Sequence, residues 1–171
     1  MKIVGYTYYH GAYCLAMKSD SSLLNQRKPF FLPDTGHTVS ATRCLVLRIS
    51  RMGRSIEPRF AYRYYDQAAW GIDFRDETCM AQGDHARALA FESSLAVGTW
   101  TDPAQPVEQV RQTNPEMLTA EQAISDISTL MTIRTGDLVY IDLPDTIEPI
   151  SREQVLSIVQ DGNELLYCKV K

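Results

Sequence analysis

The sequence lacks several features that would assign it to a broad functional class. No apolar run approaches the roughly 18 residues that a transmembrane helix needs. There is also no long basic run, and the formal net charge of −4 comes from acidic and basic residues that are mixed along the chain. We therefore expect the protein to bind neither nucleic acid nor a membrane. The first residues lack the apolar segment of a signal peptide, so we expect a cytoplasmic protein.

Common catalytic motifs are absent as well. The sequence contains no P-loop, no G-x-G-x-x-G and no G-x-S-x-G motif. Its four cysteines form no C-x-x-C pair and are too widely spaced for a typical zinc site. We expect these cysteines to be reduced and mostly buried.

The composition is that of an ordinary globular domain. The chain has 171 residues, of which 44% are apolar and 22% are charged, so we expect a single domain over residues 1–171. A hairpin is expected around Asp161-Gly162, with a helix over 151–159 as the alternative for its first half. Apolar runs predict further strands over 2–6, 13–17, 43–50, 68–74, 94–100 and 138–143.

Helices are fewer. A capping box of Thr119 and Gln122 begins a predicted helix over 119–131, and the stretch 76–91 is helical in pattern with a break near Gly83. A further helix is predicted over 57–65. The proline-containing stretch 101–116 predicts a surface loop. The fold class is therefore α+β and mostly β.

Polar residues gather where the 68–74 strand ends. Asp73, Asp76 and Glu77 could supply oxygen ligands to Mg²⁺ or Ca²⁺, or the last two could begin a helix, where negative charge is favourable. His10, beside several tyrosines, could be a general base or a stacked structural residue. Lys18 could bind a substrate carboxylate or lie exposed. The chemistry of these residues alone implies no activity.

Several stretches, taken in order, resemble the fumarylacetoacetate hydrolase superfamily, in particular its 2-hydroxyhepta-2,4-diene-1,7-dioate isomerase-like members. The superfamily contains hydrolases, decarboxylases, isomerases and hydratases of 2-oxo and β-diketo acids. The resemblance implies a fumarylacetoacetate hydrolase-like mixed β-roll and a homodimer. The matching stretches are MKSDSSLL (17–24), KPFFLPD (28–34), LVLRISRMGRSI (45–56), FAYRYYDQAAWGIDFRD (60–76), TGDLVY (135–140) and the closing hairpin.

The resemblance also implies that the active-site motifs are degenerate. The family binds a divalent metal through an E-x-E pair on one strand, and these positions carry Thr42 and Cys44 here. The third metal ligand, an aspartate on a later strand, is kept as Asp73. One carboxylate is too little for a hard cation that takes six or more oxygen ligands, and a thiol is the wrong ligand class. We therefore expect no cofactor.

Other family positions have changed too. The chain is shorter than is usual in the family, and Lys18 is retained. His10 is the nearest match to a histidine of the family's lid segment. Leu89 and Glu92 stand where the family often has a lysine and an aspartate around a phenylalanine, and a glycine-rich segment is replaced by residues 141–144.

Two functions follow as hypotheses. The favoured one is a degenerate family protein without metal-dependent catalysis that acts as a binding or regulatory scaffold, with an intact paralogue as a further expected partner. The alternative is a divergent hydrolase, isomerase or decarboxylase of small 2-oxo or β-diketo acids, with Mg²⁺ (or Mn²⁺ or Ca²⁺) as its cofactor. That enzyme would have a rebuilt site drawn from Asp73, Asp76 or Asp142 for the metal, His10 or Lys18 for proton transfer, and Lys18 and Arg75 for substrate binding.

Overall fold

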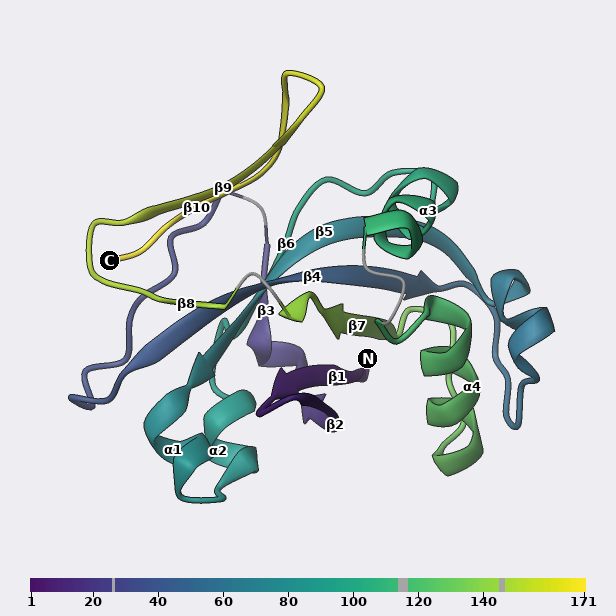
Figure 1. Cartoon of the computed structure of the whole chain (residues 1–171), viewed down its shortest axis with the longest axis horizontal. Coiled ribbons are helices and arrows are strands. Elements are labelled where there is room, and N and C mark those ends of the chain that lie inside the picture. Colours follow the sequence, from purple (N-terminus) through teal and green to yellow (C-terminus); the bar gives the residue numbers. More distant parts are fainter. Residues whose placement is uncertain (26, 114–116, 145–146) are drawn as a thin grey trace.

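A large mixed β-sheet organises the chain (Figure 1). The computed structural model describes residues 1–25, 27–113, 117–144 and 147–171. The prediction of an α+β, mostly β fold is confirmed. The strands follow the order β2 (Ala12–Lys18), β1 (Ile3–Tyr9), β7 (Leu138–Asp142), β4 (Val39–Ile49), β5 (Tyr65–Asp76), β6 (Leu95–Val97) and β3 (Leu23–Leu24), and β8 (Glu148–Pro149) pairs with β4.

The two ends of the sheet are neighbours in sequence. β2 is the first strand of the order and β3 is the last, yet only the short 3₁₀ turn Asp20–Ser22 separates them along the chain. The sheet must therefore curl until its ends approach each other. One face of the sheet consequently turns inward, as a β-roll requires.

β4 and β5 form the long central pair of the sheet. They run antiparallel from the pair Val39–Asp76 to the pair Ile49–Tyr65. β4 is buried at nearly every position, which fits its continuous apolar run. Gly71 of β5 allows the close approach expected of a mid-strand glycine, because a Cβ there would lie 2.8 Å from the sulfur of Cys44.

Side-chain alternation along β4 divides the core between the two faces of the sheet. Cys44 and Val46 belong to a cluster with residues of α1 (Glu77–Ala81) and α2 (His85–Leu89). Leu45 and Leu47 belong to a larger cluster with residues of α3 (Ala104–Thr113), α4 (Ala120–Leu130) and the C-terminal hairpin. Figure 1 shows α1 and α2 on one side of the β4–β5 pair and the hairpin on the other.

The helices agree only partly with the sequence predictions. The capping box of α4 is present, since Thr119 Oγ1 accepts from Gln122 N at 3.2 Å and Gln122 Oε1 accepts from Thr119 N at 3.0 Å. The predicted break near Gly83 separates α1 from α2. The helix predicted over 57–65 is present in part, as a 3₁₀ rather than an α-helix over Pro58–Arg63, and Tyr65 already belongs to β5. No helix in the described ranges is long and apolar enough to span a membrane.

The stretch 101–116, predicted as a loop, contains α3. Pro106 lies in the first turn of this helix, where a missing N–H costs no hydrogen bond. Val107 and Val110 supply the buried face of the helix. Residues 114–116 lie outside the described ranges, so the end of this predicted loop is not compared.

The C-terminal residues form the predicted hairpin of β9 (Val155–Gln160) and β10 (Asn163–Lys169). Asp161 and Gly162 both have positive φ, as a tight two-residue turn between twisted strands requires. The alternative of a helix over 151–159 is wrong. All four cysteines are free, and three of them, Cys44, Cys79 and Cys168, are buried as expected.

Candidate functional site

The inward face of the sheet carries a cluster of polar side chains. β4 pairs Thr42 with Asp73 of β5, and Cys44 with Asp142 of β7. Directly paired residues project from the same face of a sheet, so these four side chains are neighbours. Lys18 joins them from the end of β2, and all five residues are at most 5% exposed. The structure therefore brings Lys18, Thr42, Cys44 and Asp73 together, as the family resemblance implies.

Lys18 is completely enclosed. Its ammonium lies 2.8 Å from Asp73 Oδ1, and it donates to Leu89 O at 2.5 Å and to Ser94 Oγ at 3.0 Å. It also donates to Ser94 O at 3.4 Å, so its hydrogen bonds to Leu89 and Ser94 use the three N–H donors of a lysine, and Asp73 adds an ion pair. The alternative of an exposed lysine is wrong, because the curled sheet brings the residues before β6 over the end of β2.

Asp142 and Asp73 form a buried acid pair. Asp142 Oδ2 accepts from Thr7 Oγ1 at 2.9 Å and from Tyr8 N at 3.1 Å, whereas Oδ1 has no protein donor among the described residues. Burial raises the pKa of Asp142 well above its usual range, and the charge of Asp73 raises it further. Burial also raises the pKa of Asp73, although Lys18 opposes that effect. Two buried carboxylates side by side oppose each other's ionisation.

Arg75 closes the cluster on one side. Its Nη1 donates to Thr7 Oγ1 at 3.1 Å and to Tyr8 O at 2.7 Å, and its Nε and Nη2 donate to Glu77 Oε1 at 2.9 and 2.7 Å. The guanidinium charge is thus opposed by Glu77, and the ammonium of Lys18 is opposed by Asp73.

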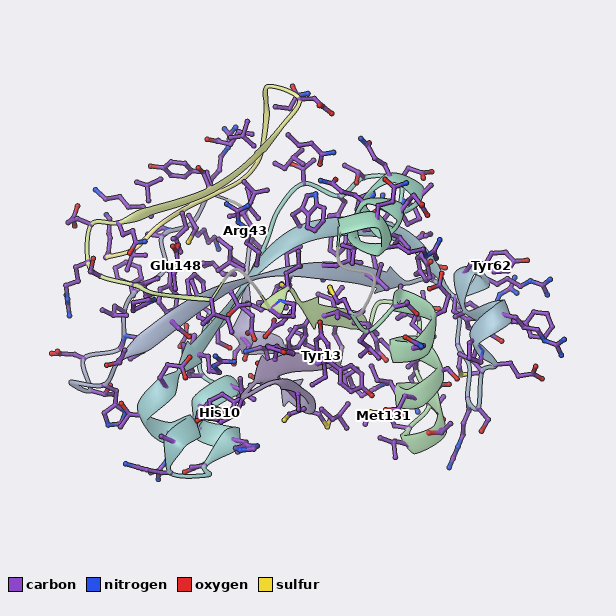
Figure 2. The ribbon with its side chains drawn as sticks, in the orientation of Figure 1. His10, Tyr13, Arg43, Tyr62, Met131 and Glu148 are labelled. Atoms are coloured by element: carbon purple, nitrogen blue, oxygen red, sulfur yellow. The ribbon has the colours of Figure 1, made fainter. Side chains whose placement is uncertain are left out.

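A surface pocket of about 320 Å³ lies beyond Arg75. His10 lines it and stacks edge-on against the ring of Tyr9, with 4.0 Å between the ring centroids. Figure 2 shows His10 on the side of the molecule that carries α1 and α2, far from Tyr62 at the opposite end. The structure therefore brings His10 and Arg75 to one pocket, while Lys18 and Asp73 lie in the interior. The pocket is completed by Tyr8, Ser40, Glu77, Ile147 and Pro149.

Solved structures of known proteins share this architecture. The chain matches fumarylpyruvate hydrolase from Pseudomonas aeruginosa, solved with Mn²⁺ and pyruvate, with a TM-score of 0.80 and 16% identity over 99% of this chain and 88% of that chain. It matches 2-hydroxyhepta-2,4-diene-1,7-dioate isomerase from Mycobacterium marinum with a TM-score of 0.82 and 19% identity, over 99% and 73% of the two chains. A protein attributed to the fumarylacetoacetate hydrolase family, from Yersinia pestis, matches with a TM-score of 0.83 and 16% identity, over 99% and 93%.

This chain has the fumarylacetoacetate hydrolase fold. The resemblance seen in the sequence is thereby confirmed at the level of the fold, and with it the predicted mixed β-roll. No family model and no curated protein matches the sequence.

The polar cluster does not fit the hard divalent cation that this fold family implies. It offers two carboxylates, both buried, and the ammonium of Lys18 already contacts one of them. Thr42 supplies a neutral hydroxyl. Burial raises the pKa of Cys44 well above its usual range, and the charges of Asp142 and Asp73 raise it further, so its thiol stays protonated. Mg²⁺ and Mn²⁺ prefer several ionised oxygen ligands, so this donor set disfavours them.

The remaining acids at the end of β5 have other roles. Asp76 points away from the cluster and caps α1, accepting from Cys79 N at 2.9 Å. Glu77 lies in the first turn of α1. The interpretation of these two residues as a helix start is confirmed. Asp142, rather than Asp76, is therefore the acid beside Asp73.

Sequence reasoning missed three members of the cluster: Thr7, Ser94 and Tyr140, whose ring centroid lies 5.7 Å from Lys18 Nζ. Their hydroxyl groups resemble those of any strand or turn residue, and only the curl of the sheet brings them together. One signal was present, because Asp142 is an acid inside the apolar run of β7, where a charge needs partners.

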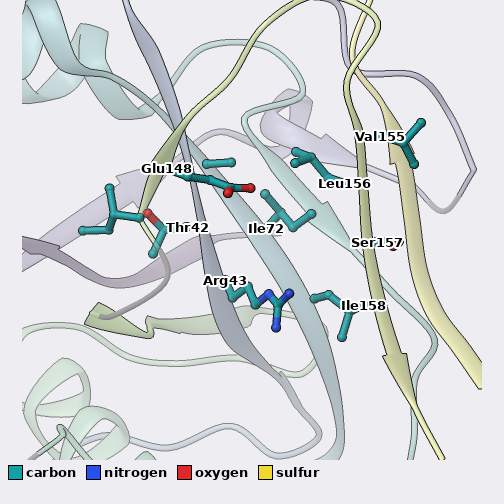
Figure 3. A pocket seen from close by; sticks show the side chains of 10 residues that line it. Thr42, Arg43, Ile72, Glu148, Val155, Leu156, Ser157 and Ile158 are labelled. Atoms are coloured by element: carbon teal, nitrogen blue, oxygen red, sulfur yellow. The ribbon is translucent and has the colours of Figure 1, made fainter.

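A larger pocket, of about 480 Å³, opens on the other face of the sheet between β4 and β9 (Figure 3). Arg43 and Ile72 form its floor, Glu148 lines one side and Leu156 to Ile158 line the other. Of the residues at the family's metal-binding positions, Thr42 also lines this pocket. This pocket lacks the grouped acids of the inward face.

Proposed function

We propose that this protein is a catalytically silent relative of fumarylacetoacetate hydrolases that acts as a binding or regulatory scaffold. The observation that supports this proposal is the position of Lys18. Its buried ammonium lies 2.8 Å from Asp73, the retained family metal position, and supplies there the positive charge that a divalent ion would otherwise bring.

An ammonium cannot replace the metal in catalysis. A catalytic divalent ion polarises substrate oxygens through open coordination positions. The three donors of Lys18 are all directed at backbone and side-chain oxygens of Leu89 and Ser94. No donor is left to polarise a substrate oxo group, so the metal-dependent reaction has no counterpart here.

The binding role is assigned to the pocket beyond Arg75. Its volume of about 320 Å³ suits a small organic molecule. Tyrosine rings and His10 can contact a small 2-oxo acid there, whereas Arg75 is engaged by Glu77 and would have to change partners to bind its carboxylate. A homodimer, an intact paralogue as partner and a cytoplasmic location remain parts of this proposal.

Isothermal titration with Mg²⁺ and Mn²⁺ tests the loss of the metal site. The wild-type protein and Asp73→Ala should give the same weak, unsaturated heats. Micromolar Mg²⁺ or Mn²⁺ binding that disappears in Asp73→Ala would overturn the proposal. A parallel assay of fumarylpyruvate and oxaloacetate hydrolysis or decarboxylation should show no turnover above the metal-only blank.

A second candidate is the divergent hydrolase, isomerase or decarboxylase of small 2-oxo or β-diketo acids. The observation that favours it is the buried acid pair of Asp73 and Asp142, which connects through Thr7 and Arg75 to the pocket. Turnover of fumarylpyruvate that is lost in both Asp142→Asn and His10→Gln, but kept in Arg48→Ala, would favour this enzyme over the scaffold.

A further inference from the structure

A second cluster of side chains lies where β5 ends and α1 begins, beside the loop before β4. His37, from the loop before β4, places its Nδ1 2.7 Å from Asp76 Oδ2 and 3.8 Å from Cys79 Sγ. One ligand atom from each of the three residues lies within 4.8 Å of the other two. The side chain of His37 is 34% exposed, and Asp76 and Cys79 are buried beneath it.

Backbone contacts hold the three residues in place. Asp76 and Cys79 are three positions apart at the start of α1, and the N–H of Cys79 fixes Asp76 Oδ1 at 2.9 Å, which leaves Oδ2 facing His37. The loop that carries His37 is tied to the same turn, since Glu77 N donates to Thr38 O at 2.9 Å. The arrangement is therefore built before any ligand arrives.

We propose that His37 Nδ1, Asp76 Oδ2 and Cys79 Sγ form a binding site for Zn²⁺ that is separate from the interior cluster around Asp73. Zinc–ligand bonds of about 2.0 to 2.3 Å in a tetrahedron place neighbouring ligand atoms about 3.4 to 3.6 Å apart. The 2.7 and 3.8 Å separations reach these values with shifts of less than about 1 Å, which a surface histidine allows. Three protein ligands leave a fourth position for water or another small ligand.

The chemistry of the ligands selects the metal. A thiolate, an imidazole and a carboxylate together are typical of zinc, whereas Mg²⁺ and Ca²⁺ require oxygen ligands. Burial raises the pKa of the Cys79 thiol, and the charges of Asp76 and Asp84 raise it further, with Arg87 opposing them. A bound cation removes this bias, so zinc binding should release about one proton from Cys79.

The test is metal binding by the intact protein after removal of metals with EDTA. Zinc competition against a chromophoric chelator should give one Zn²⁺ per chain. Co²⁺ in its place should show thiolate charge-transfer absorption and the intense visible bands of tetrahedral cobalt. Cys79→Ser and His37→Gln should each weaken zinc binding by about 100-fold or more, and Cys79→Ser should remove the charge-transfer band.

Cys14→Ser is the matched control, because it removes a free cysteine outside the cluster. It should bind zinc as the wild-type protein does. Substoichiometric zinc in the wild-type protein, or unchanged affinity in folded His37→Gln, would overturn the proposal. Circular dichroism establishes folding, and His37→Gln changes only a partly exposed loop residue. Asp73→Ala should keep zinc binding, so this result is independent of the scaffold proposal.

Discussion

Asp73 and Asp76 are three residues apart on β5 and have opposite surroundings. Asp73 points into the β-roll, where it is 1% exposed and contacts the ammonium of Lys18. Asp76 points outward, where it accepts a hydrogen bond from the backbone of α1 and contacts a partly exposed histidine. Strand alternation alone separates the two environments.

The comparison shows that two acids near the end of one strand can have different electrostatic partners. The interior acid has its cation supplied by the chain itself, and the cluster around it is buried. The outer acid shares its surroundings with a thiol and an imidazole, and so can accept a cation from solution. A carboxylate at a family metal position therefore does not identify a metal site unless its partners are known.

The largest expected effect is at Lys18. Lys18→Met leaves the buried charge of Asp73 without its partner, so the free energy of unfolding should fall by about 3 to 5 kcal/mol. Urea denaturation monitored by circular dichroism measures this change. The double variant Lys18→Met, Asp73→Asn removes both charges and should recover much of the loss. A single variant as stable as the wild-type protein would show that the pair contributes nothing.

The next effect is the pH dependence of the acid pair. Asp142 has a raised pKa in the folded protein, so its contribution to stability is complete below about pH 4, the unfolded value. It declines as pH rises toward the folded pKa. Asp142→Asn imitates the protonated acid, so its stability relative to the wild-type protein should increase with pH. A difference that stays constant between pH 4 and 8 would contradict a raised pKa of Asp142.

Asp76 should show the opposite pH dependence. Burial alone would raise its pKa, but hydrogen bonds from Cys79 and His37 outweigh that effect and lower it. Its contribution is therefore present above about pH 4 and is lost as pH falls through the folded pKa. Asp76→Ala also removes the cap of α1, and should cost about 1 kcal/mol at neutral pH. Thermal unfolding at pH 7 and pH 3 should show a smaller stability difference between Asp76→Ala and the wild-type protein at pH 3.

The smallest effect is expected at the surface pair of Arg48 and Asp66. Arg48 Nη2 lies 2.9 Å from Asp66 Oδ2, but both side chains are more than 40% exposed. Solvent screening limits such a pair, so Arg48→Ala should cost less than about 1 kcal/mol. The unfolding midpoint of Arg48→Ala, measured in low and in high salt, gives the effect of losing a surface ion pair. That effect is then compared with the effect of Lys18→Met. A loss equal to that of Lys18→Met would remove the contrast between interior and surface.

Much of the fold could be predicted from the sequence, because buried strands have continuous apolar sequences. The runs around Leu45 and Val139 and the Asp161-Gly162 turn predict strands that the structure contains. α3 was missed because Pro103 just before it and Pro106 in its first turn resemble the prolines of a loop, while its buried stripe is only Val107 and Val110.

The candidate site was predictable only in part. The positions of Thr42, Cys44 and Asp73 came from family resemblance, and pairing across β4 and β5 brings them together. The enclosure of Lys18 depends on the closure of the roll, which joins the end of β2 to the residues before β6. Lys18 simply follows an apolar strand in the sequence. The residues around it therefore do not predict such a long-range contact.

The central claim is that a lysine ammonium provides the interior positive charge at the family metal position. The most direct measurement is a crystal structure grown with Mn²⁺ and oxalate, with anomalous diffraction recorded to locate manganese. The account predicts Lys18 Nζ in contact with Asp73 and no manganese peak at that carboxylate. A manganese ion bound to Asp73, with Lys18 displaced, would contradict it.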